Sequence, residues 1–256
     1  VAHWTISPNG HDELRYDEEW LQSDRRRPLS LSLPLQAGAI RNAAVGAYFD
    51  NLLPDSDPIR KRLQARFGTA TRGAFDLLEA IGQDCVGAVQ LMPLGSEPTD
   101  YRETDAMPLS EAKVAQVLRD TILPGDGIHR GGHADFRISI AGAQEKTALT
   151  FNEGQWCLPR GATPTTHIFK LPLGLVSARK ADMRTSVENE WLCARLLGLF
   201  GVPVAETAMA TFEDQKALLV TRFDRQRTAD GYWLRMPQED FCQALGCPSA
   251  LKYESD

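Results

Sequence analysis

The sequence lacks the apolar runs and the positive charge that would indicate contact with a membrane or with nucleic acid. No stretch approaches the length needed to span a bilayer, and the start does not show the basic and then apolar pattern of a secretory signal. The 28 lysines and arginines are outnumbered by 34 acidic residues, which gives a formal net charge of −6. Such a chain is not built to hold nucleic acid by neutralising phosphates. The compact basic run of residues 25–27 is typical of a solvated rim.

Cysteine is also scarce. The five cysteines are scattered, and Cys242 and Cys247 are five positions apart, which is not a metal-ligand spacing. The histidines do not cluster near them. An odd number of scattered thiols is typical of a reduced, cytoplasmic protein. We therefore expect buried structural cysteines, a cytoplasmic location and no metal site.

The chain has 256 residues, longer than one average domain, so we expect two compact units or one large irregular unit. Hydrophobic residues make up 43%, which is enough for a core without disulfides. The sequence starts at Val1 rather than at a methionine and ends at Asp256. We interpret it as a cloned piece of a longer protein, a processed chain or the product of a truncated gene, and the sequence does not choose among these.

The first half mixes short strands and helices. Leucines alternate with polar residues over 29–35, which predicts a half-buried strand that Pro34 places at an edge or an end. Pro58 opens a helix that Gly68 ends. Residues 91–108 are rich in proline and predict a loop. A second amphipathic helix is expected over 111–120, and the glycines that follow it suggest a boundary between units.

The second half is dominated by predicted strands. One helix is expected to start with a capping box of Thr185 and Glu188, to run to Phe200 and to end at Gly201. This order of strands, one helix and further strands resembles the small lobe of a protein kinase. The strands are expected over residues 136–140, 148–151, 156–158, 167–171 and 217–221.

Lys170 is the first residue that suggests a binding or catalytic role. It lies in an apolar strand between Phe169 and Leu171, where a lysine needs a partner. Glu190 is a candidate, because it shares a face of the next helix with apolar residues. A kinase uses a strand lysine and a helix glutamate of this kind to hold nucleotide phosphates. A purely structural ion pair, or a lysine that reaches solvent, explains the pattern equally well.

Two other segments are ambiguous when taken alone. Residues 140–146 place small residues between two strands, next to a lysine, so backbone N–H groups there are able to approach an anion. The segment is neither a P-loop nor a kinase glycine-rich loop, and by itself it indicates a tight turn. Residues 217–225 lead from an apolar strand into a polar stretch. This edge suits a nucleotide base, but a surface ion network of Asp224 with its flanking arginines is the simpler interpretation.

Many segments together resemble the HipA family, in the family's order and along nearly the whole chain. The family consists of bacterial serine/threonine protein kinase toxins, held in check by a small DNA-binding antitoxin and directed at the tRNA-charging machinery. The segments that carry the resemblance are residues 27–35, 49–55, 81–88, 136–146, 164–170, 187–190, 222–225, 234–240 and 252–256.

The resemblance implies an α+β fold in three parts. Residues 1–132 would be the HipA N-terminal domain, residues 133–228 a kinase small lobe that binds nucleotide, and residues 229–256 the start of a helical C-terminal lobe. It implies ATP and Mg²⁺ as cofactors of the complete kinase. The implied partners are a HipB-like antitoxin and a protein substrate such as an aminoacyl-tRNA synthetase, with DNA reached only through the antitoxin and no membrane contact.

The resemblance also assigns roles to individual residues. Glu190 would pair with Lys170, and Ser139 matches the family's autophosphorylation site, where a phosphate would add negative charge beside an anion site. Thr221 to Phe223 would border the adenine through backbone groups. The residues implied in ATP binding are Ala141, Gly142, Ala143, Gln144, Glu145, Lys146, Lys170, Thr221, Arg222 and Phe223.

The family's catalytic machinery has no counterpart in this sequence. A kinase needs an aspartate that accepts the substrate hydroxyl proton, an asparagine, and a second aspartate for magnesium. No Asp-Gly-His-x-x-Asn-like segment occurs, so we expect no catalytic residue here and an inactive fragment of a kinase toxin. The alternative is a truncated, non-catalytic HipA-like module that binds antitoxin or target. An unrelated α+β nucleotide-binding protein is a third interpretation, which the number of collinear segments disfavours.

Overall fold

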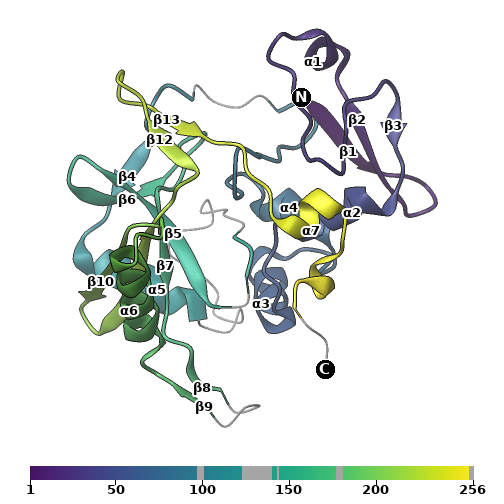
Figure 1. Ribbon diagram of the computed structural model, residues 1–256. Coiled ribbons are helices and arrows are strands. Elements are labelled where there is room, and N and C mark those ends of the chain that lie inside the picture. The colour runs from purple at the N-terminus through teal and green to yellow at the C-terminus, as the bar shows by residue number, and fades with distance from the viewer. Residues whose placement is uncertain (97–100, 123–139, 143, 177–180, 254–256) are drawn as a thin grey trace.

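The computed structural model describes residues 1–96, 101–122, 140–142, 144–176 and 181–253 (Figure 1). They form two hydrophobic cores, one in the N-terminal region and one around a six-stranded sheet. Figure 1 shows α2, α3, α4 and α7 gathered on one side of the molecule, with the six-stranded sheet, α5 and α6 on the other. The predicted α+β class is confirmed. No helix among the described residues is long and apolar enough to cross a membrane.

The N-terminal core forms between a three-stranded antiparallel sheet and short helices. Trp4 stacks on Phe49 with ring centroids 3.8 Å apart, and Leu14, Tyr48 and Leu77 are fully buried beside them. Burial of such large side chains supplies most of the stabilisation of a unit of this size. The elements are β1 (Ala2–Ile6), β2 (Asp12–Tyr16), α1 (Glu18–Gln22), β3 (Ala39–Ile40), α2 (Ala43–Asp50), α3 (Asp57–Phe67) and α4 (Ala74–Ile81).

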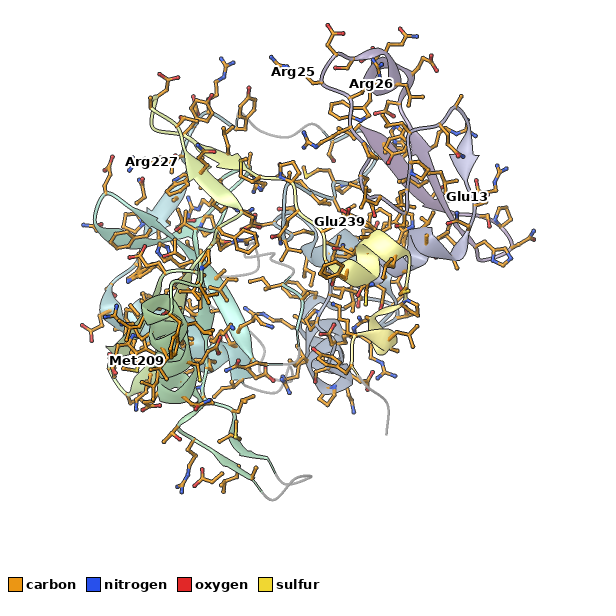
Figure 2. All side chains as sticks on the ribbon, in the orientation of Figure 1. Glu13, Arg25, Arg26, Met209, Arg227 and Glu239 are labelled. Atoms are coloured by element: carbon orange, nitrogen blue, oxygen red, sulfur yellow. The ribbon has the colours of Figure 1, made fainter. Side chains whose placement is uncertain are left out.

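The predictions for this region have mixed outcomes. Helix α3 is confirmed, with a proline in its first turn and Gly68 at φ 66°, the left-handed conformation that ends many helices. The strand predicted over 29–35 is wrong. Leu33 is buried and Leu31 is exposed, but the Leu33 N–H donates to the Ser30 carbonyl at 3.1 Å in a tight turn. The alternating pattern therefore came from a turn that inserts one leucine into the core. Figure 2 shows Arg25 and Arg26 at the outer edge of this region, as a solvated rim requires.

The second core lies on one face of a sheet whose neighbouring strands are all antiparallel, in the order β10-β11-β7-β5-β6-β4. Helix α5 (Glu111–Ile122) packs on that face, and α6 (Ser186–Leu199) contacts β10 and β11. The strands are β4 (Ala106–Pro108), β5 (Lys146–Asn152), β6 (Gln155–Pro159), β7 (His167–Lys170), β10 (Thr207–Phe212) and β11 (Gln215–Thr221), with a small hairpin of β8 (Gly174–Val176) and β9 (Ala181–Met183).

Most predictions for the sheet are confirmed, including the strands at 148–151, 156–158, 167–171 and 217–221 and the helix at 111–120. The expected loop at 91–108 contains the short strand β4. Helix α6 and its end at Gly201, with φ 78°, are also confirmed, but the capping box is wrong. Thr185 makes no capping hydrogen bond, and the Glu188 carboxylate pairs with Lys216 on β11 instead. The strand predicted over 136–140 lies outside the described residues, except for buried Ile140.

The last described residues return to the N-terminal region. After the hairpin of β12 (Arg225–Arg227) and β13 (Trp233–Arg235), α7 (Phe241–Leu245) packs against α2. The buried Gln243 side chain donates to the Tyr48 carbonyl at 3.1 Å. A single 3₁₀ turn, η2 (Ser249–Leu251), follows. The boundary expected at residue 132 lies outside the described residues. Strand β4 and helix α5, which precede it, belong to the second core.

Candidate nucleotide site

Lys170 and Glu190 form an ion pair between β7 and α6. Helix α6 is held on this side of the sheet by a second pair, Glu188 with Lys216 of β11. The Lys170 side chain is 26% exposed and that of Glu190 is 38% exposed, so the pair is open to a ligand. The structure thus brings together the two residues that the sequence pattern suggested. Their role in holding phosphate stays a prediction.

The sheet register gives this lysine an apolar surrounding. Lys170 lies opposite Lys146 on one side and Leu218 on the other. Two residues along, Ile168 lies between Ala148 and Val220. Because side chains alternate along a strand, all of these lie on the same face as Lys170. The opposite face packs against α5, so the Lys170 face combines two cations with an apolar floor.

Sequence reasoning missed Ile168 and Val220, the partly exposed apolar residues of this face, as part of the site. The two-residue periodicity of a strand could have identified Ile168, because it lies two positions before Lys170 on β7 and therefore shares its face. The cross-strand neighbours were not available, because register depends on pairing between strands that are distant in sequence.

The loop between Ile140 and β5 is held to the end of β7 by two hydrogen bonds near its β5 end. The Gln144 side chain donates to the Leu171 carbonyl at 2.7 Å, and the Leu171 N–H donates to the Glu145 carbonyl at 3.1 Å. Gly142 has φ 113°, a conformation that favours glycine. These contacts place Gln144 and Glu145 at the end of β7 that carries Lys170. Ser139 and Ala143, which were also predicted here, lie outside the described residues.

Lys146 folds back over this loop. Its ammonium donates to the Ala141 carbonyl at 2.7 Å, and a Cβ added to Gly142 would lie only 2.6 Å from Lys146 Nζ. Burial, and next the charge of Lys170, lower the pKa of Lys146 to about 8. Lys146 and Lys170 thus bring two ammonium groups together on neighbouring strands. In the contacts described above, Lys170 is paired with a carboxylate and Lys146 with a carbonyl, so the two charges favour binding of an anion between them. A phosphate group fits this demand.

The segment at 221–223, predicted to border the adenine, lies at and just after the end of β11. The Thr221 N–H donates to the Glu206 carbonyl and the Arg222 N–H donates to the Thr166 carbonyl, each at 2.9 Å. Both donors are therefore used inside the fold. Phe223 is 76% exposed. A role for these residues at the adenine would have to use their carbonyl groups and Phe223, and it stays a prediction.

Asp224 and its flanking arginines are buried, so the interpretation as a surface network is wrong. Arg222 and Arg225 contact the Asp224 carboxylate at 2.7 and 3.0 Å. Arg225 and Arg235 each also reach Asp84 at 3.0 Å. The five residues form one cluster, which we call the arginine–aspartate cluster. It joins residues 84–87 of the N-terminal region to the strand end that follows β11, because the Asp224 carboxylate also accepts from the Gly87 N–H at 2.7 Å.

Asp84 is the centre of the arginine–aspartate cluster. Its carboxylate accepts from the Thr165 hydroxyl at 2.6 Å and from the Thr165 N–H at 3.1 Å. Burial alone would raise the pKa of Asp84, but Arg225, Arg222 and Arg235 outweigh burial and hold it at about 2. The same carboxylate, together with burial, raises the pKa of the adjacent Cys85 thiol to about 12, so this cysteine is an inert, buried thiol. Sequence reasoning did not single out Asp84 or Arg235, although both lie in segments that carry the family resemblance.

No group of three His, Cys, Asp or Glu side chains among the described residues is arranged to hold a metal ion. The site therefore offers lysines, backbone groups and an apolar surface for a nucleotide. Within the described part of the chain it offers no ready set of ligands for Mg²⁺.

Comparisons with known proteins agree with this architecture. The model of the HipA N-terminal domain matches residues 4–92, and the model of the HipA-like C-terminal domain matches residues 138–256. The chain is a HipA-type protein. The two matches fall, in order, on the N-terminal core and on the sheet that carries Lys170.

Relatives of this HipA-type chain are considerably longer. It is 35% identical to Y4mE of Sinorhizobium fredii, a protein named as a kinase, over 100% of the chain and 59% of that relative. It is 31% identical to the serine/threonine-protein kinase toxin HipA of Shewanella oneidensis, over 94% of the chain and 52% of that protein. The chain thus spans little more than half the length of these curated relatives.

A solved structure shares the fold. It is the complex of Shewanella oneidensis HipA and HipB with operator DNA, in which the matched chain gives a TM-score of 0.75 at 28% identity. The match covers 99% of this HipA-type chain and 56% of the solved one.

Proposed function

We propose that this chain forms the nucleotide-binding half of a HipA-type serine/threonine protein kinase toxin and binds ATP on the Lys170 face of its sheet. The observation that carries the proposal is the ion pair of Lys170 and Glu190 at the end of an apolar strand face, beside a second lysine. A lysine held by a helix glutamate is oriented toward phosphates rather than toward bulk water. Curated relatives named as kinases support the same reaction class.

Each part of the site has a distinct task in this proposal. Lys170 and Lys146 would contact the phosphates, and the backbone of residues 141–146 would approach them. Ile168 and Val220, which are partly exposed, would face the base. Mg·ATP would supply the phosphoryl group, but the catalytic and metal-binding aspartates have no counterpart in this sequence. We therefore propose that the chain binds nucleotide and does not by itself transfer phosphate.

The proposed setting is a type II toxin–antitoxin system of the bacterial cytoplasm. The related HipA of Shewanella oneidensis is solved together with HipB and operator DNA, which supports a HipB-like antitoxin as partner. In this proposal DNA is reached through the antitoxin, and the substrate is a protein such as an aminoacyl-tRNA synthetase. Ser139 would be the site of autophosphorylation in the complete kinase, where its phosphate would repel nucleotide.

The test is calorimetric titration of the purified chain with Mg·ATP. We expect binding by the wild type, and a loss of about tenfold or more in affinity for Lys170→Met and for Glu190→Gln, because removal of a charged hydrogen-bond partner typically costs about 1.5–3 kcal/mol. Lys216→Met is the matched control, since Lys216 also pairs with a glutamate of α6. Equal affinity in all four proteins would reject the site. A wild-type chain that ignores Mg·ATP but binds the antitoxin would favour the non-catalytic binding module.

A further inference from the structure

Two residues of the N-terminal region hold the loop of residues 141–146. The Asp55 N–H donates to the Gly142 carbonyl at 3.2 Å. From α3, the Arg62 guanidinium pairs with the Glu145 carboxylate. Neither residue belongs to the sheet that carries Lys170. The loop is therefore fastened to the N-terminal region near both of its ends, in addition to its bonds to β7.

Asp55 is itself fixed from the far end of the described chain. Its carboxylate accepts from Lys252 Nζ at 3.2 Å and from the Tyr253 hydroxyl at 2.9 Å. The side chains of Asp55 and Lys252 are only 8% and 13% exposed. A backbone N–H held in this way is a rigid anchor for Gly142. The loop thus depends on residues from three separate parts of the sequence.

Rigidity matters here because the loop has little intrinsic order. Gly142 samples many backbone conformations when it is free, so fixing the loop around a phosphate costs conformational entropy at the moment of binding. Contacts that fix the loop beforehand remove part of that cost and raise affinity.

The charge of Arg62 has a second effect. Glu145 lies one residue before Lys146, and an unpaired carboxylate there would repel a nucleotide polyphosphate. Arg62 offsets that charge. The side chains of Arg62 and Glu145 are 28% and 27% exposed, so solvent screens the pair only partly.

We propose that Arg62 and Asp55 are positioning residues of the nucleotide site: they hold Gly142 and Glu145 of the loop in place for phosphate binding, and Arg62 neutralises Glu145. The inference rests on the proposed function. It makes the N-terminal region a working part of the site.

The first measurement needs no nucleotide. Hydrogen exchange of the Asp55 and Leu171 backbone amides, which donate to the Gly142 and Glu145 carbonyls of the loop, should accelerate about fivefold in Arg62→Met, the size that a partly exposed ion pair is able to supply. Lys61→Met is the matched control, because it removes the same charge from an exposed position of the same helix. Exchange in Arg62→Met that equals exchange in Lys61→Met would overturn the role of Arg62 in fixing the loop.

The second measurement is Mg·ATP affinity. Arg62→Met should bind Mg·ATP about fivefold more weakly than Lys61→Met, because the lost ion pair is worth about the same free energy as in the exchange measurement. Adding Glu145→Gln to Arg62→Met should restore most of that loss, because the unpaired carboxylate is then gone. A purely structural role of Arg62 would not be rescued by this second change, so failure of rescue would reject the neutralisation.

The two measurements separate this inference from the proposed function. Absence of Mg·ATP binding in the wild type, together with faster exchange in Arg62→Met, would reject the nucleotide site and keep the loop contact. Normal binding in the wild type and in Arg62→Met, with weak binding in Lys170→Met, would keep the site and overturn the inference.

Discussion

Two groups of charged residues in this molecule differ in burial and in the number of partners that each residue has. The arginine–aspartate cluster contains Asp84, Asp224 and three arginines, all of them with side chains no more than 8% exposed. Lys170 and Glu190 form a pair that is open to solvent. Members of the cluster have several partners each, and the contact between Lys170 and Glu190 is a single one.

This difference separates a structural role from a binding role. A buried charge must have its hydrogen bonds satisfied by the protein itself, so a cluster of this kind has no capacity left for a ligand. A half-exposed lysine with one partner keeps donors free for an anion. We therefore expect the cluster to determine stability and the exposed pair to determine affinity, and four predictions test that division.

The largest effect should come from Asp84→Ala. The change leaves Arg225 and Arg235 buried beside each other without their shared carboxylate, and breaking a buried pair in this way costs about 3–5 kcal/mol. We expect a corresponding loss in the free energy of unfolding, measured by urea denaturation. Asp182→Ala, which removes an exposed partner of Arg184, serves as the control and should leave the melting temperature unchanged.

Acid should weaken the same cluster. The pKa of Asp84 is about 2 in the folded protein and close to its ordinary value of about 4 in the unfolded chain, so this stabilisation is present above about pH 4 and is lost as the pH falls toward 2. The wild type should therefore lose about 2 kcal/mol over this interval that Asp84→Ala does not lose. Parallel acid profiles for the two proteins would contradict the assignment of Asp84 as the centre.

The exposed pair could be predicted from the sequence, and the buried cluster could not. The pairing of Lys170 with Glu190 was accessible because each residue violates its local pattern: a lysine in an apolar strand and a glutamate on an apolar helix face. The strands β5, β6, β7 and β11 were accessible for a similar reason, since their alternating or apolar runs are local signals.

The remaining features depend on contacts that no local pattern records. Asp84 and Arg235 are ordinary polar residues in sequence, and only the packing of the N-terminal region against the strand end at 222–225 buries them together. The leucines at 29–35 mimic a strand in sequence, but the turn from Ser30 to Leu33 breaks the alternation, because both of these residues are buried and Leu31 is exposed. Arg62 has the appearance of a surface residue of α3 until the fold brings Glu145 beside it.

The next effect in size should come from Lys170→Met, which should lower affinity and leave stability nearly unchanged, the reverse of Asp84→Ala. An exposed ion pair contributes about 0–1 kcal/mol to stability, so the free energy of unfolding should change little. Affinity for Mg·ATP should fall about tenfold or more, because a charged hydrogen bond to phosphate is lost. Urea denaturation and calorimetric titration of the same preparation measure both quantities. A large loss of stability with unchanged affinity would place this pair with the structural cluster.

The smallest effect should appear in the pH dependence of nucleotide binding. The pKa of Lys146 is about 8 in the free protein, lowered by burial and by Lys170, so this side chain loses its charge as the pH rises through 8. A phosphate binds the charged form better and would raise that pKa again, which links binding to proton uptake. Affinity for Mg·ATP should therefore fall severalfold between pH 7 and 9 in the wild type. Lys146→Met, whose side chain does not titrate, should bind more weakly at pH 7 and show a flatter profile. Equal pH profiles for the two proteins would mean that Lys146 closes the loop onto Ala141 without meeting the nucleotide, and Lys170 would then be the cation that carries the site.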